Sequence, residues 1–177
     1  MRFAETELPG AYVVKLERRE DERGWFARVW DPNELGDHGL DTRIAQISVA
    51  WNERAGTLRG LHYQADPHGE AKVVRCTRGA IYDVLVDLRP DSSMHGRWTA
   101  LELAEDDPRM LYVPDGIAHG YQTLADGTET LYLISELYRP ELQRGVRWDD
   151  PAFAIRWPDV PERVISARDR AWPDFTG

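Results

Sequence analysis

Short segments in which apolar and polar side chains alternate are the feature that most limits how this chain can fold. These segments are rich in β-branched and aromatic residues, and clusters of Pro, Gly and Asp separate them at intervals of about 8 to 12 residues. The clearest are VVRC (73–76), AIYDVLVDLR (80–89), WTALELA (98–104), MLYVP (110–114) and TLYLISELY (130–138). Alternation with period two is typical of half-buried strands. We therefore predict an all-β protein, an antiparallel sandwich or barrel.

Signals for helices are few. Asp31 followed by Pro32 suits the start of a short helix, because aspartate caps a first turn well and proline fits its first position. A second short helix is expected at 162–170. No repeat, linker or low-complexity stretch divides the chain, so we expect one domain, 1–177. Its Pro- and Trp-rich C-terminal residues are expected to wrap irregularly around the barrel.

The overall charge limits the partners of the protein. Against 22 Lys and Arg stand 31 Asp and Glu, a net charge of −9, which argues against nucleic acid or an anionic membrane as a general partner. No stretch is apolar enough to span a bilayer, and MRFAETELPG has no signal-peptide pattern. The single Cys76 cannot form an internal disulfide, and its strand position indicates a buried structural thiol. We expect a cytoplasmic protein.

Cationic side chains inside the predicted strands indicate where the function lies. The segment TLRGLHYQ (57–64) carries Arg59 and His62 among apolar residues, and LYVPDGIAHGYQTL embeds His119 in the same way. Lys72 lies between these two segments in the sequence. Polar groups directed at a shared interior are typical of a ligand cavity. We therefore predict a cationic pocket inside an acidic protein.

Strict alternation would place Arg59 and His62 on opposite faces of their strand. Gly60 lies between them, and a glycine inside a strand is a common position for a bulge that redirects one side chain. A bulge at Gly60 would bring both cations to one cavity.

The run AIYDVLVDLR contains two aspartates within a predicted apolar strand. Asp83 and Asp87 share a face with Ile81 and Leu85, so at least one carboxylate is expected to be buried. A buried aspartate requires a partner, and Lys72 is our first candidate.

Several long motifs, in order along nearly the whole chain, closely resemble the dTDP-4-dehydrorhamnose 3,5-epimerase family. They are GTLRGLHYQ, EAKVVRCTRGAIYDVLVDLRPDS, GRW, MLYVPDGIAHGYQTL, ETLYLISELYRPE, GVRWDDPAFAIRWP and ISARDR. The resemblance implies a cupin-like jelly-roll barrel, a homodimer, and an active site inside the barrel with neither metal nor cofactor. It also implies a dTDP-linked 4-keto sugar, dTDP-4-dehydro-6-deoxy-glucose, as the substrate that is epimerised at both carbons beside the ketone.

This chemistry requires more than a base. An imidazole and a carbon acid beside a ketone differ by roughly a dozen pK units, at ~1.36 kcal/mol each, so donors must also stabilise the enolate oxygen. His62 suits the base and Lys72 the enolate stabiliser. By resemblance, Tyr132 is the acid on the opposite face of the sugar, and Asp169 orients the histidine. The simpler alternatives are a hydrogen-bonded core histidine, a surface lysine, an ordinary strand tyrosine, and an aspartate paired with a neighbouring arginine.

The substrate-binding residues are also predicted from the resemblance. Arg59 and His119 are expected to contact the diphosphate or the sugar, since a guanidinium offers forked donors to phosphate oxygens. Arg23 matches an arginine on an N-terminal arm that reaches the partner's site, although a solvated surface arginine is the alternative. The remaining predicted contacts are Gln46, Tyr138, Gln143 and Arg168.

Departures from the family pattern concentrate at nucleotide-facing positions. Arg28 stands where many members have a glutamate associated with the nucleotide, Gln143 where glutamate is frequent, and Arg168 where lysine is frequent. The predicted catalytic set is intact. The reaction type is therefore expected to be kept, while nucleotide and sugar preference are open.

Three alternative functions remain at this point. One is a 3-only or 5-only epimerase that acts on a related nucleotide 4-keto-6-deoxysugar. Another is a metal-dependent cupin oxygenase, although His62-Tyr63-Gln64 stands where such enzymes carry a histidine pair. The third is a sugar-binding module without catalysis, for which an opposed acid and base would have no use.

Overall fold

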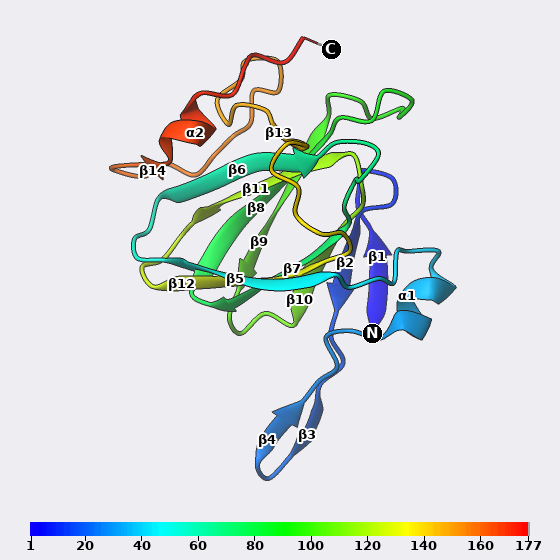
Figure 1. Ribbon diagram of the computed structural model, residues 1–177. Coiled ribbons are helices and arrows are strands. Elements are labelled where there is room, and N and C mark those ends of the chain that lie inside the picture. Colours follow the sequence, from blue (N-terminus) through cyan, green and yellow to red (C-terminus); the bar gives the residue numbers. More distant parts are fainter. Residues whose placement is uncertain (177) are drawn as a thin grey trace.

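Two antiparallel sheets face each other and form the walls of a barrel in the computed structural model, which describes residues 1–176 (Figure 1). The first sheet has the order β1-β2-β10-β7-β12-β5, with β1 (Arg2–Glu5), β2 (Tyr12–Lys15), β5 (Gln46–Asn52), β7 (Lys72–Arg78), β10 (Arg109–Val113) and β12 (Thr128–Ile134). The second has the order β13-β6-β11-β8-β9, with β6 (Thr57–Gln64), β8 (Ala80–Asp87), β9 (Trp98–Ala104), β11 (Ile117–Thr123) and β13 (Gln143–Gly145). Strand β14 (Val164–Ile165) pairs with β6 in parallel. The prediction of an all-β antiparallel architecture is confirmed.

Each of the predicted strand runs forms a strand, but three end earlier than expected, β8 and β10 by one or two residues and β12 by four. The run TLYLISELY was predicted as a strand to Tyr138, whereas β12 ends at Ile134. Strand β5 was not among the predicted runs, although its large apolar residues Ile47, Val49 and Trp51 occupy alternate positions. Ile47, Val49 and Trp51 are 64%, 58% and 41% exposed, so the apolar side chains of this edge strand face away from the barrel interior.

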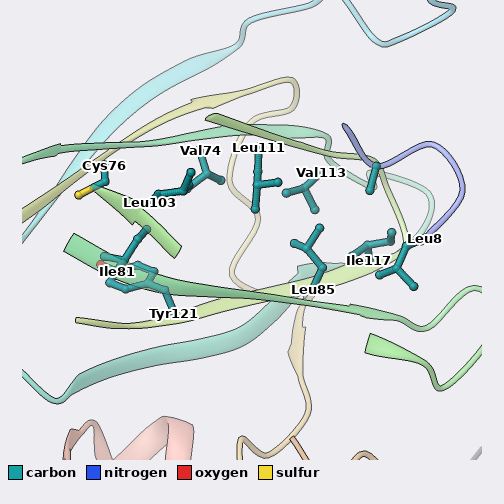
Figure 2. Close-up of a cluster of buried hydrophobic side chains, with 11 residues drawn as sticks. Leu8, Val74, Cys76, Ile81, Leu85, Leu103, Leu111, Val113, Ile117 and Tyr121 are labelled. Atoms are coloured by element: carbon teal, nitrogen blue, oxygen red, sulfur yellow. The ribbon is translucent and has the colours of Figure 1, made fainter. Parts of the chain in front are cut away.

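The space between the sheets is filled by an apolar core (Figure 2). Leu85 from the second sheet and Val74 and Leu111 from the first are almost completely buried there. Cys76 belongs to the same cluster, as predicted for a structural thiol, and burial raises its pKa to about 11. Toward the β5 and β6 side of the barrel, polar residues replace apolar ones and line a cavity.

One of the two predicted helices is correct and the other is mostly wrong. Helix α1 (Pro32–Asp37) is capped by Asp31, whose carboxylate accepts hydrogen bonds from two backbone N–H groups of the first turn. The helix predicted at 162–170 is reduced to α2 (Ala167–Arg170). Val164 instead donates its backbone N–H to the Gly56 carbonyl at 3.0 Å and begins β14, because β6 offers a free edge there.

Two segments lie outside the barrel walls. The hairpin of β3 (Arg19–Asp21) and β4 (Gly24–Phe26) extends away from the rest of the chain (Figure 1). The C-terminal segment packs on the outer face of the second sheet, where Phe153 and Trp157 cover apolar residues and Trp98 donates its indole N–H to the Phe153 carbonyl. Among the described residues, no helix combines the length and the apolar character needed to cross a membrane.

Candidate active site

A cavity of about 630 Å³ lies between the two sheets, beside β6, β11 and β12 and under α2. All of the predicted site residues line it except Gln46 and Arg23. Those that do are His62, Lys72, Tyr132, Asp169, Arg59, His119, Tyr138, Gln143 and Arg168. The sequence-based prediction of a cationic pocket inside the barrel therefore agrees with the structure.

His62 and Asp169 form a close pair in this cavity. Nε2 of His62 lies 2.6 Å from Oδ1 of Asp169, which is 5% exposed. Ser166 caps α2 by accepting a hydrogen bond from the Asp169 backbone N–H at 3.1 Å, and this cap places the carboxylate beside β6. Burial raises the pKa of Asp169, but the hydrogen bond and charge of His62 outweigh it, so the pKa is below its usual value. The structure thus pairs Asp169 with the histidine and not with a neighbouring arginine.

An irregularity at Gly60 directs Arg59 and His62 into the same cavity, as predicted. In the pairing of β6 with β11, His62 is opposite His119 and Arg59 is opposite Tyr121, so β6 contains one extra residue. Gly60 has a φ of +128°, and a Cβ there would lie 2.5 Å from the Gly120 Cα. Only glycine fits this close approach of two backbones.

The predicted partnership of Lys72 and Asp83 is wrong. Lys72 Nζ lies 2.9 Å from Glu70 Oε1, and it donates to the His62 carbonyl at 3.4 Å. Asp83 Oδ1 lies 2.5 Å from Nε2 of His119. The strand order explains this: β8 and β11 are neighbours in the second sheet, whereas Lys72 lies on β7 in the first.

The other predicted carboxylate, Asp87, is fully buried and pairs with Arg89 at 2.6 Å.

Tyr132 lies on the wall opposite His62, because β12 belongs to the first sheet and β6 to the second. Its ring packs edge-to-face against His119, with centroids 6.0 Å apart. Burial, followed by the Tyr121 phenol and Asp83, raises its pKa well above the usual value for tyrosine. Tyr132 therefore keeps its proton until a strongly basic atom forms nearby. A base and an acid on opposite walls can act on opposite faces of one ligand.

Comparison with known proteins agrees with this geometry. The family profile described as dTDP-4-dehydrorhamnose 3,5-epimerase matches residues 5–177. The chain belongs to this family. It is an epimerase, and the cupin-like jelly roll implied by the sequence resemblance is confirmed.

Relatives and solved structures match over almost the full chain. The dTDP-4-dehydrorhamnose 3,5-epimerase of Methanothermobacter thermautotrophicus is 41% identical, covering 97% of this chain and 92% of its own. The Bacillus anthracis enzyme, solved with TDP and PPi bound, has a TM-score of 0.94 and 36% identity and covers 98% of this chain and 99% of its own. ChmJ of Streptomyces bikiniensis, a 3'-monoepimerase solved in complex with dTDP-quinovose, has a TM-score of 0.88 and 33% identity. The match covers 96% of this chain and 85% of ChmJ.

In this epimerase, three of the four remaining predicted contacts, Tyr138, Gln143 and Arg168, line the cavity. The Tyr138 hydroxyl donates to Gln143 Oε1 at 2.6 Å, and both side chains line the cavity. Gln46 lies behind them, where its Oε1 accepts a hydrogen bond from the Tyr138 backbone N–H at 2.6 Å. The Arg168 guanidinium stacks on the Trp172 ring at 5.4 Å. Gln46 therefore supports the cavity wall and does not line it.

Arg23 lies at the turn of the β3–β4 hairpin and does not reach the cavity of its own chain. Its side chain is 84% exposed and pairs with Asp21 at 2.6 Å. Arg28, where many family members have glutamate, also lies outside the cavity and pairs with Asp31 at 2.8 Å. A role for Arg23 in a partner's site stays a prediction.

Among the site residues that sequence reasoning missed, three contact predicted ones. Glu70 pairs with Lys72, and the two-residue spacing in EAK could have indicated a shared strand face. Tyr121 lines the cavity two residues after His119. This position could also have been predicted, because residues two apart in a strand share a face. Trp172 packs its ring against His62 with centroids 6.0 Å apart, and no local pattern could have indicated that contact. Within residues 1–176, no group of three or more His, Cys, Asp or Glu side chains could hold a metal ion.

Proposed function

We propose that this cavity binds dTDP-4-dehydro-6-deoxy-D-glucose and inverts carbons 3 and 5, giving dTDP-4-dehydro-L-rhamnose without a cofactor. The observation that supports this most is the His62–Asp169 pair on one wall and Tyr132 on the other. Inversion at a carbon requires removal of hydrogen from one face and delivery to the opposite face. Binding alone would not need such an arrangement, which argues against a non-catalytic module.

His62 acts as the base in this proposal. Its imidazole takes a proton from the carbon beside the ketone and becomes positively charged, and the buried Asp169 carboxylate 2.6 Å away stabilises that charge. Lys72 supplies the positive charge for the enolate oxygen, because its ammonium group is held in the cavity by Glu70 and by the His62 carbonyl. The enolate then returns to the ketone when carbon accepts a proton.

Tyr132 provides that proton. The O–H bond of Tyr132 breaks as the new C–H bond forms on the face opposite His62. The raised pKa of Tyr132 suits this step, since the phenol holds its proton in the resting enzyme and yields it only to a basic carbon. Both carbons 3 and 5 flank one ketone, so the same three groups serve both inversions if the ring rearranges between them. Before the second inversion, His62 releases its proton to solvent and Tyr132 takes one from solvent.

The nucleotide part of the substrate follows from solved relatives. The Bacillus anthracis structure contains TDP and PPi, and the Legionella pneumophila structure contains dTDP-4-keto-L-rhamnose. We assign Arg59 and Arg168 to the diphosphate, because both guanidinium groups line the cavity. His119 is held by Asp83 and is assigned to the sugar side.

A 3-only epimerase is the second candidate, since ChmJ, a 3'-monoepimerase, has the same fold at 33% identity. Reaction in heavy water with NMR detection separates the two. A 3,5-epimerase incorporates deuterium at both carbons, whereas incorporation at carbon 3 alone would identify a monoepimerase. A downstream reductase added to the reaction identifies the product sugar.

The enzyme is also proposed to be a cytoplasmic homodimer. Ile47 and Val49 on the outer face of β5, and Trp25 and Phe26 on the β3–β4 hairpin, are large apolar side chains exposed to solvent. Such residues on an edge strand and a projecting hairpin are typical of an interface. A hairpin that crosses to a second copy would carry Arg23 with it.

Substitution of His62 tests the reaction. His62→Ala should lower turnover by at least about 100-fold, the range lost with a general base, while the fold is kept. His68→Ala is a matched control, because His68 lies outside the cavity. Near-normal turnover in His62→Ala would remove His62 from the mechanism, and no deuterium at either carbon with substrate bound would contradict the proposed inversion of this sugar.

A further inference from the structure

A gap beside His62 holds the indole ring of Trp172, which follows α2 in the chain. In the pairing of β13 with β6, Gly145 is directly opposite His62, and opposite residues of an antiparallel pair share a face. A Cβ at residue 145 would lie 2.4 Å from Cε2 of Trp172, 2.6 Å from its Nε1 and 2.7 Å from the Leu61 carbonyl oxygen. The indole therefore occupies space next to His62 that a side chain of residue 145 would fill.

This ring contacts two of the residues to which the proposed function gives roles. The His62 and Trp172 rings pack edge-to-face, with centroids 6.0 Å apart and planes inclined by 67°. Arg168, four residues before Trp172, places its Cζ atom 5.4 Å from the indole centroid. His62 and Arg168 line the cavity and Trp172 does not, so Trp172 can affect the reaction only through its neighbours.

Packing, and not a hydrogen bond, holds the indole in this place. Its Nε1 atom is buried and has no hydrogen-bond partner among residues 1–176. A buried donor without a partner is unfavourable, and leucine or phenylalanine would fill space without that cost. Tryptophan offers instead the aromatic face that attracts a cation most strongly. The contact with Arg168 therefore explains a tryptophan here better than space filling does.

Each contact restricts a motion that would disturb the reaction. Asp169 holds His62 at one atom, Nε2, at 2.6 Å. A contact at one atom leaves the imidazole free to tilt, and the indole packed against the ring limits that tilt. Arg168 is exposed, and stacking on the indole restricts its long side chain before the substrate arrives.

We propose that Trp172 is a positioning residue that serves both parts of the substrate. It keeps the His62 ring aligned with the carbon that loses a proton, and it keeps the Arg168 guanidinium at the cavity wall for the diphosphate. Gly145 is required because it leaves room for the indole. The inference rests on the proposed function, in which His62 is the base and Arg168 binds the diphosphate.

Trp172→Leu removes the aromatic face and fills part of the same space. KM for the nucleotide sugar and Kd for dTDP should rise by about two- to fivefold, the factor for a cation–π contact at an exposed site. The kcat per folded enzyme should fall on the order of tenfold, since a small misplacement of a catalytic group slows a reaction strongly. A residue that only stabilised the fold would change neither KM nor Kd, because neither depends on how much of the enzyme is folded.

Arg168→Met separates the two contacts, because methionine keeps a long side chain and removes the charge. In that background Trp172→Leu should raise KM no further, since the cation–π contact is already lost. It should still lower kcat, since the contact with His62 remains. Fully additive effects on KM would contradict the role of the Arg168 contact, and an unchanged kcat would contradict the role of the His62 contact.

Trp148→Leu is the matched control. Trp148 lies in the same C-terminal segment, and the Arg163 guanidinium stacks on its ring at 4.9 Å, outside the cavity. This variant removes a cation–π contact of the same kind, so it should lose stability but keep the wild-type KM, Kd and kcat per folded enzyme. If Trp172→Leu behaves like Trp148→Leu, the inference is wrong.

Trp172→Phe is the milder variant. It keeps a smaller aromatic face that attracts a cation less strongly, so its KM should lie between those of wild type and Trp172→Leu. If Trp172→Leu does not fold, a wild-type KM and kcat in Trp172→Phe would contradict the inference. Failure of the wild-type enzyme to invert the sugar would instead overturn the proposed function, so the two failures are distinguishable.

Discussion

Asp169→Asn removes the charge beside His62 and keeps the shape of the side chain. In the structure, Asp169 Oδ1 lies 2.6 Å from His62 Nε2, and the carboxylate is buried. The amide oxygen of Asn can still accept from the imidazole N–H, so ring orientation is kept. What is lost is the stabilisation of the imidazolium that forms when carbon is deprotonated.

The size of the effect follows from the strength of such a bond. A hydrogen bond to a charged group contributes about 1.5–3 kcal/mol, and each 1.36 kcal/mol is about tenfold in rate. Asp169→Asn should therefore lower kcat by roughly 10- to 150-fold. KM should change little, because ground-state binding does not require the charged imidazolium.

Steady-state kinetics with the purified substrate, together with thermal unfolding, check this prediction. Asp174→Asn is a suitable control. Asp174 is an exposed carboxylate in the same C-terminal segment, and it pairs with Arg147 at the surface. It should retain full turnover. The reasoning is refuted if Asp169→Asn keeps turnover within about twofold of wild type at unchanged stability.

Three further outcomes are expected. Folding lowers the pKa of Asp87, because hydrogen bonds from Arg89 and Ser92 outweigh the effect of its burial. The contribution of Asp87 to stability is therefore present above about pH 4. It is lost as the pH falls through the lower pKa of the folded state. Asp87→Asn should thus lower Tm at pH 7 and differ less from wild type in acid, as calorimetry can show. Cys76, with a pKa of about 11, should resist alkylation at pH 8 until the protein unfolds, which mass spectrometry can follow. Phe26→Asp should weaken the proposed dimer in light scattering, and a fully active wild-type monomer at micromolar concentration would contradict it.

The sequence by itself determined the class of fold and many of the polar side chains that line the cavity. Alternation is a local property: it states which side chains share a face of a strand, and this was enough to predict β6, β7 and β8 and the interior position of His62 and Lys72. It failed for β5, whose apolar side chains Ile47 and Val49 face outward. Large apolar residues do alternate in β5, but alternation does not state which face of a strand points into the barrel.

The partners of the site residues were decided only by the tertiary structure. His62 and Asp169 are 107 residues apart and meet because β14 joins the free edge of β6 and carries α2 to the cavity mouth. Asp83 pairs with His119 and not with Lys72 because strand order makes β8 and β11 neighbours. Residue parity restricts the face on which a side chain lies, but the group across from it depends on which strands pair and in what register.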